Sequence, residues 1–124
     1  MRILITGSRD WTDGYAIENA ILQAVNSSED KVITIVHGGA AGADRISDNI
    51  AKKHGFNTEV HMADWHNNGR AAGIIRNNKM VYEGADICLA FIRNNSKGAT
   101  HCSNAAMNAD IPTRVFRINE EDEW

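Results

Sequence analysis

The stretch ILITGSRDW, residues 3–11, holds the pattern from which the fold prediction starts. Its unbroken apolar run, residues 3–5, is typical of a strand that is covered on both faces in a parallel sheet. Gly7 then permits a sharp turn, and a hydroxyl, a guanidinium, a carboxylate and an indole follow in order. Because a turn needs only the glycine, these four side chains indicate a ligand above the end of the strand.

The same pattern of apolar run and turn recurs along the chain. Further strands are predicted at residues 32–36, 58–61, 87–92 and 113–116, and helical spacing lies between them at 17–25, 43–54, 70–84 and 98–109. This alternation predicts an α/β fold, a Rossmann-like open parallel sheet of about five strands in the order 3-2-1-4-5 with helices on both faces. We expect one domain, residues 1–118, and an acidic C-terminal tail, residues 119–124.

Composition narrows the class of protein. The formal charge is −3, but residues 1–118 carry 13 basic and 12 acidic side chains, a poor footprint for duplex nucleic acid. The apolar runs are too short to span a bilayer, and the N-terminus shows no secretory leader. Cys88 and Cys102 lie in apolar or small-residue segments, as reduced thiols do. We therefore expect a cytoplasmic protein with no membrane partner.

The predicted topology places a ligand site. In open α/β sheets the ligand crevice lies at the carboxyl ends of the strands, where the strand order reverses. Here that point lies between the first and fourth strands, which residues 7–11 and 93–100 follow directly. From the first turn we expect Gly7, Ser8, Arg9 and Trp11 to contact the ligand. Two alternatives stay open, in which Asp10 or Asp13 caps the next helix and Trp11 packs on it.

A glycine-rich turn, HGGAAGAD at residues 37–44, joins the second strand to the next helix. Its glycines would let a ligand approach the backbone, and N–H groups at the helix start would form a cradle for phosphate. The predicted contacts here are Gly38, Gly39, Ala40, Gly42 and Asp44. A tight turn that binds nothing is the structural alternative, and Asp44 either favours the helix dipole or accepts from a ribose hydroxyl.

Two more stretches complete the predicted site. On the helix at 70–84, Arg70, Arg76 and Asn77 offer cationic and amide groups, and Gly73 in a helix interior suggests close approach of another group. A solvated basic face is the alternative. At the start of the last helix, the predicted contacts are Ser96, Lys97, Gly98 and Thr100, although Ser96 could simply cap that helix.

Metal and nucleophile motifs are not predicted. His37, His61, His66, His101, Asp64 and Cys102 lack the local spacing of a zinc site. No nucleophile elbow surrounds a serine or cysteine. We therefore expect no metal and no cofactor.

Together these four stretches resemble the SLOG superfamily, in particular its YspA-like, YpsA-related branch, from Arg2 to about Phe116. The resemblance implies a nucleotide-binding domain, homo-oligomers and, for some members, a role as sensors in conflict and defence systems. It also implies a distant similarity to LOG-type phosphoribohydrolases, which split the base from nucleoside 5′-monophosphates. Residues 96–100 correspond to part of their motif P-G-G-x-G-T-x-x-E, and the catalytic glutamate, three residues after the threonine, would fall at Ser103, which has no carboxylate.

The function predicted from the sequence is therefore capture of a nucleotide or ADP-ribose-like ligand, as a sensor or by sequestration. A first alternative is an N-glycosidase that acts on nucleoside 5′-monophosphates, with Asp10 or Asp44 as the carboxylate and Arg76 beside it; enzymatic activity is left open. A second alternative is single-stranded nucleic acid binding, in which Trp11 and Trp65 stack on bases.

Overall fold

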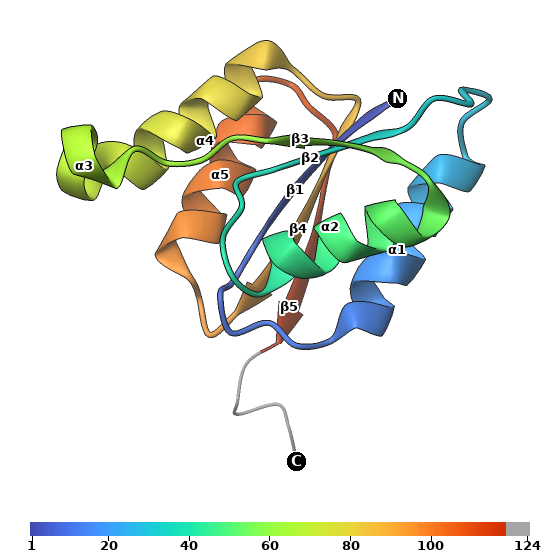
Figure 1. The fold of residues 1–124 in the computed structure, drawn as a ribbon, viewed down its shortest axis with the longest axis horizontal. Coiled ribbons are helices and arrows are strands. Elements are labelled where there is room, and N and C mark those ends of the chain that lie inside the picture. The colour runs from blue at the N-terminus through green and yellow to red at the C-terminus, as the bar shows by residue number, and fades with distance from the viewer. Residues whose placement is uncertain (119–124) are drawn as a thin grey trace.

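The computed structural model describes residues 1–118, in which strands and helices alternate along the chain (Figure 1). The strands are β1 (Arg2–Gly7), β2 (Thr34–His37), β3 (Asn57–Val60), β4 (Ile87–Arg93) and β5 (Thr113–Ile118). The helices are α1 (Gly14–Asn26), α2 (Ala43–His54), α3 (Trp65–Asn68), α4 (Ala72–Glu83) and α5 (Lys97–Asn108), with a 3-10 turn, η1 (Gly69–Ala71), before α4. The predicted acidic tail lies outside the described residues.

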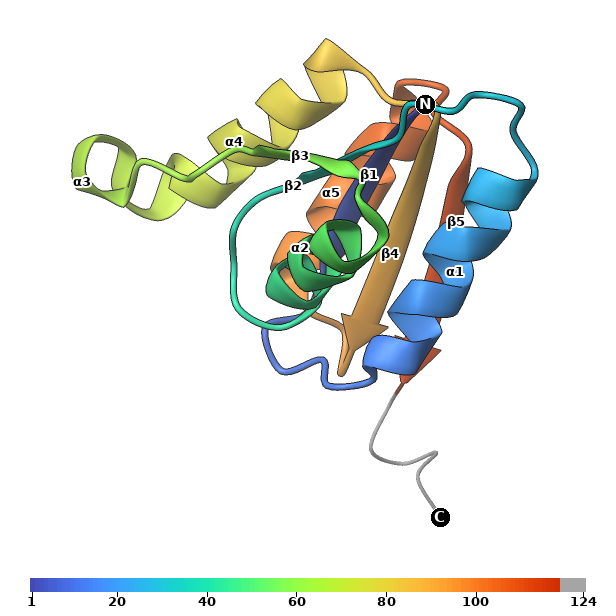
Figure 2. The ribbon, with the colours of Figure 1, turned by 45° about the vertical axis from the view of Figure 1, so that its right-hand side comes forward.

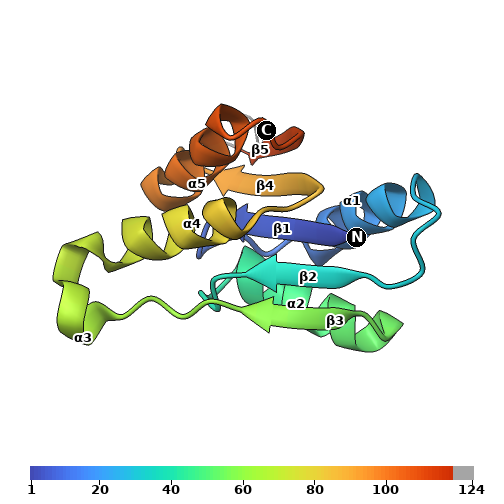
Figure 3. The same cartoon turned by 90° about the horizontal axis from the view of Figure 1, so that it is seen from above.

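All five strands pair in parallel in the order β3-β2-β1-β4-β5, which confirms the predicted fold (Figure 3). Helices α1 and α2 cover one face of the sheet, and α4 and α5 lie over the other (Figure 2). Strand β1 is central because its side chains enter both layers. Ile3 and Ile5 pack with α1 and α2, whereas Leu4 packs with Met80 and Cys102 from α4 and α5.

Glycines set the bounds of α2. Gly42 precedes it and Gly55 follows it, both at φ +74°, and the Gly55 N–H bonds back to the carbonyl of Lys52. The left-handed conformation ends a helix, and glycine adopts it without a Cβ penalty. The predicted end of this helix, a basic last turn followed by a glycine stop at Gly55, is therefore confirmed.

The single helix predicted at 70–84 is wrong at its start. Asp64 caps the short helix α3 by accepting from the Asn67 N–H, and Gly69 at φ +53° ends it. Helix α4 begins only at Ala72, so Arg70 lies in the 3-10 turn and Gly73 in the first turn of α4 rather than in a helix interior. Helix α3 and the start of α4 extend beyond the carboxyl ends of β2 and β3 (Figure 3).

Within residues 1–118, no helix combines the length and the apolar character that crossing a membrane requires.

Candidate functional site

A cavity of about 580 Å³ lies at the carboxyl ends of β1 and β4, at the predicted reversal of strand order. We call it the strand-end cavity. The predicted site residues that line it are Gly7, Ser8, Arg9, Asp10, Ala40, Asp44, Arg70, Arg76, Asn77, Ser96, Lys97 and Gly98. Four separate loops and helix starts thus converge, as the topology requires. Its other lining residues are Thr6, Trp65, Gly73, Ile74, Met80, Arg93, Asn94, Ala99 and His101.

Trp11 does not line this cavity. Its side chain is only 3% exposed, packs edge to face on Phe91 at 5.4 Å between ring centroids, and donates from Nε1 to the carbonyl of Asp13. Asp13, rather than Asp10, caps α1 by accepting from the Ala16 N–H. Trp11 is therefore a packing residue, as in the structural alternative, and not a ligand contact. Burial of its large apolar ring in the core stabilises the fold.

The glycines of the turn after β2 make room for the protein itself. A Cβ on Gly42 would lie 2.5 Å from the carbonyl oxygen of Arg9, and one on Gly39 would lie 2.5 Å from the sulfur of Met62. A Cβ on Gly38 would meet the guanidinium of Arg76. Gly38, Gly39 and Gly42 do not line the strand-end cavity, although the first two border an adjoining hollow of about 140 Å³. Internal packing, rather than close approach of a ligand, therefore explains these glycines.

The same turn does not offer a free phosphate cradle. The N–H groups of Gly38 and Ala40 donate to Oδ2 of Asp44, at 3.1 and 3.3 Å, and the N–H of Gly39 donates to Nδ1 of His37 at 3.0 Å. A carboxylate of the chain thus occupies the position that the sequence suggested for a ligand anion. The N–H groups of Gly38, Gly39 and Ala40 are thus already paired within the chain, so this part of the predicted cradle over residues 38–43 is not free for a phosphate.

Asp44 is the most unusual group on the cavity wall. The residue is 5% exposed, and its Oδ1 is buried with no hydrogen-bond partner among residues 1–118. Burial raises the pKa of Asp44, against the opposing effects of His37, of the two amides and of Arg76. A buried polar atom without a partner is costly, so its presence in a cavity wall points to a group that comes from outside.

Arg76 links the turn to the other side of the cavity. Its Nη1 donates to the carbonyl of Gly38 at 2.7 Å, and its Nε donates to Oδ1 of Asn77 at 2.9 Å. The buried Asn77 in turn donates from Nδ2 to the carbonyl of Gly98, at the start of α5, at 3.2 Å. These contacts hold the guanidinium of Arg76 beside Asp44. Asn77 therefore acts as a side chain that positions this guanidinium.

Ser8 ties the two central strands together. Its Oγ accepts from the N–H of Arg93 at 2.7 Å and donates to the carbonyl of Arg93 at 3.2 Å. The residue is 1% exposed, so its hydroxyl is already committed within the protein. We therefore correct its predicted role as a phosphate donor to that of a structural link.

The start of α5 is the part of the cavity best suited to an anion. Ser96 stands at the N-cap without a side-chain capping bond, and a Cβ on Gly98 would meet nothing within 4 Å. The first N–H groups of a helix have no partner within it, and the helix dipole favours negative charge there. Lys97 and Arg93 lie beside this turn on the cavity lining. Thr100 points back into the helix, where its Oγ1 donates to the carbonyl of Ser96 at 2.6 Å, and does not line the cavity.

The rim adds an aromatic and a cationic side chain. The guanidinium carbon of Arg9 lies 5.9 Å from the ring centroid of Trp65, which is half exposed at the start of α3. The sequence suggested Trp65 only as a stacking surface for nucleic acid bases. Trp65 lines the strand-end cavity because α3 extends past the carboxyl ends of β2 and β3.

Of the two candidate carboxylates for hydrolysis, only Asp44 is buried. Asp10 is exposed, with its Oδ2 at 3.6 Å from Nε of Arg93. Ser103 is buried and donates from Oγ to the carbonyl of Thr100 at 3.0 Å.

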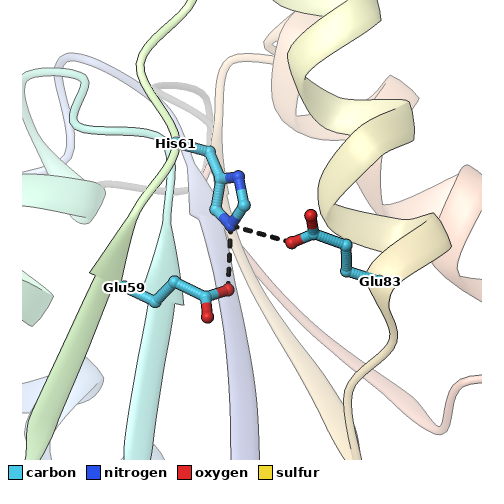
Figure 4. Close-up of side chains that lie close together, drawn as sticks. All are labelled: Glu59, His61 and Glu83. Carbon is cyan, nitrogen blue, oxygen red and sulfur yellow. Dashed lines mark hydrogen bonds and ion pairs between the residues drawn. The ribbon is translucent and has the colours of Figure 1, made fainter.

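Away from this cavity, one group within residues 1–118 has the donor atoms for a metal, Glu59, His61 and Glu83, whose ligand atoms all lie within 4.8 Å of one another. Figure 4 shows His61 directed between the two carboxylates, with Nε2 at 2.8 Å from Glu59 and 3.3 Å from Glu83. Arg2 already engages both oxygens of Glu59, at 3.0 and 2.8 Å. Arg2 and His61 lower the pKa of Glu59 to about 2. We interpret these four residues as an ion-pair cluster that fastens the end of α4 to β1 and β3.

Comparisons with known proteins agree with the resemblance noted in the sequence. The model of the family described as YAcAr, the YspA, cpYpsA-related SLOG family, matches residues 1–67. The chain is also 45% identical over 120 residues to the "Gene 61 protein" of Mycobacterium phage D29, in a match that covers 93% of this chain and 95% of that protein. No solved structure matches the chain significantly.

Proposed function

This chain belongs to the YspA, cpYpsA-related SLOG family, and we propose that its strand-end cavity binds a nucleotide or a nucleotide-derived ligand. One observation carries the proposal. Five cationic side chains, Arg9, Arg70, Arg76, Arg93 and Lys97, line the cavity against two acidic ones, Asp10 and Asp44. Residues 1–118 as a whole are nearly neutral, so this local excess of positive charge favours a small anion.

The proposed pose follows from the chemistry of the walls. The phosphate lies at the first turn of α5, where Lys97 and the N–H groups attract it. Arg9 stands at the rim as a second cationic contact, and Trp65 and Ile74 offer an aromatic and an apolar surface to the base. We propose that the protein acts as a sensor or by sequestration of such a ligand, including ADP-ribose-like molecules.

Native mass spectrometry of freshly purified protein and thermal unfolding with a nucleotide panel test the proposal. We expect a co-purifying small molecule or a rise in melting temperature with at least one nucleotide. Lys97→Glu should remove that rise, because it reverses the charge at the start of α5. The matched control is Lys31→Glu, in the exposed loop before β2 at the opposite end of the strands. No stabilisation by any nucleotide at millimolar concentration would contradict the proposal.

A second candidate function is hydrolysis of the N-glycosidic bond of a nucleoside 5′-monophosphate. The observation that favours it is Asp44, a buried carboxylate with a raised pKa beside Arg76 on the cavity wall. A carboxyl group whose pKa is raised is a candidate general acid or base. Incubation with nucleotides and chromatography for free base tests it. Release of base that disappears in Asp44→Ala would establish hydrolysis, and no release would leave binding alone.

A further inference from the structure

The unpartnered oxygen of Asp44 is the feature that the proposed function leaves unused. Asp44 lines the strand-end cavity, is 5% exposed, and holds two backbone N–H groups with Oδ2 alone. Its Oδ1 has no partner within residues 1–118. The side chain cannot turn to satisfy Oδ1 elsewhere without releasing Gly38 and Ala40. A group from outside the protein must therefore supply the missing hydrogen bond.

The nature of that group follows from charge and from the neighbouring side chain. The free oxygen Oδ1 can accept a hydrogen bond, and a fully ionised phosphate has no hydrogen to give it. The guanidinium of Arg76, held against the carbonyl of Gly38, only donates. A site that offers an acceptor beside a donor suits an alcohol, which gives one hydrogen bond and receives another.

The place of Asp44 in the sheet narrows the choice further. It lies in the first turn of α2, the helix that follows β2, and in nucleotide-binding parallel sheets an acidic side chain that follows the second strand accepts from ribose hydroxyls. The chain of contacts from Gly38 through Arg76 and Asn77 to Gly98 joins this wall to the start of α5. Sugar and phosphate of a nucleotide are separated by one methylene group, so adjacent subsites of this kind fit them.

We propose that Asp44 is a specificity-determining residue, whose Oδ1 accepts a hydrogen bond from a ribose hydroxyl and selects ribonucleotides over their deoxy forms. This inference rests on the proposed function and fixes the direction of the ligand. The sugar edge faces α2 and Arg76, and the phosphate faces α5.

The test compares the four common ribonucleoside 5′-monophosphates with their 2′-deoxy and 3′-deoxy forms by calorimetric titration. For the wild-type protein we expect at least one deoxy form to bind about tenfold or more weakly than the ribonucleotide, because its loss leaves Oδ1 unpaired again. Equal affinities for all three forms would overturn the inference and leave nucleotide binding intact. Absence of binding by every form would also overturn the inference, and the proposed function would fall with it if the wider nucleotide panel gave no stabilisation either.

Asp44→Asn probes the same oxygen directly. An asparagine keeps one oxygen for the N–H groups of Gly38 and Ala40 and replaces Oδ1 with an amide that donates. We expect its preference for the ribonucleotide to fall to about twofold or less, and a preference that persists would overturn the inference. The matched control is Asp48→Asn, the same change one turn further along α2, where the side chain bonds to His37 and Lys52 and does not line the cavity. If Asp44→Asn fails to fold, the deoxy series on the wild-type protein decides alone.

Discussion

Gly42→Ala should destabilise the protein far more than the same change at Gly55, although both glycines have φ of +74°. At Gly55 a new Cβ would meet nothing within 4 Å, so the cost is the left-handed conformation alone, about 1 kcal/mol. At Gly42 the Cβ would meet the carbonyls of Ser8 and Arg9, the latter at 2.5 Å. That backbone is held in place, since the Ser8 carbonyl accepts from Trp11 and Ala43 and its N–H donates to Phe91.

The magnitude follows from these contacts. Strain at a conformation that favours glycine, together with overpacking against immovable backbone, costs roughly 4 kcal/mol in the free energy of unfolding. The entropy of unfolding of a 124-residue chain is about 0.26 kcal/mol per kelvin, at about 2.1 cal/mol per kelvin per residue. We therefore expect the melting temperature to fall by about 15 °C for Gly42→Ala and by about 4 °C for Gly55→Ala.

Thermal unfolding followed by circular dichroism measures both variants under the same conditions. The two falls should differ by about 10 °C. Melting temperatures that agree within about 3 °C would refute the reasoning, because the turn after β2 would then not be packed on the backbone that follows β1.

Four further predictions follow from the structure. Arg76→Ala should abolish the nucleotide-induced rise in melting temperature while the protein still folds, and Arg76→Lys should keep part of it; an undiminished rise in the alanine variant would remove Arg76 from the site. The pKa of Glu59 is lowered to about 2, so its ionised form stabilises the fold above pH 4.5 and this contribution is lost as the pH falls towards 2. In denaturant titrations over that range, Glu59→Gln should therefore lose less stability than the wild type, and equal losses would contradict the ion pairing. Burial raises the pKa of Cys88 to about 12 and that of Cys102 to about 11, so iodoacetamide at pH 8 should alkylate neither thiol in the native protein and both in urea, as intact mass would show. The family resemblance predicts a homo-oligomer, so light scattering should give a mass above 13.7 kDa, and Ile75→Glu should lower it because this apolar side chain is 48% exposed; a monomeric wild type would refute the expectation.

The sequence predicted β1, β2 and β4 well because each contains a short, unbroken apolar run. Strand β3, with the sequence NTEV, has only one apolar residue and gave a weaker signal. The end of the helix at 43–54 was predicted correctly, since it depends on Gly55, whose backbone freedom is a local property. The start of α4 was missed, because a capping contact of Asp64 and a positive φ at Gly69 broke a continuous helical pattern.

The candidate site was likewise predictable in part. The sequence could predict that the turns after β1, β2 and β4 lie close to α4. Parallel strands have their carboxyl ends at the same edge of the sheet, and these turns all follow that edge. The roles of single side chains could not. Nothing local to Ser8 indicates that its hydroxyl is used by Arg93, a residue 85 positions away in the chain.

The amino-acid sequence by itself thus determined the alternation of elements, the order of the strands and the edge of the sheet at which the strand-end cavity lies. Periodicity, glycine positions and charge act over a few residues, so they can be read along the chain. Only the tertiary structure decided that Asp44 takes the amides of Gly38 and Ala40 in the glycine-rich turn and keeps one buried oxygen unpaired. Which acceptor bonds to a given N–H group depends on which one lies close to it in space, and the packing of the whole domain determines that.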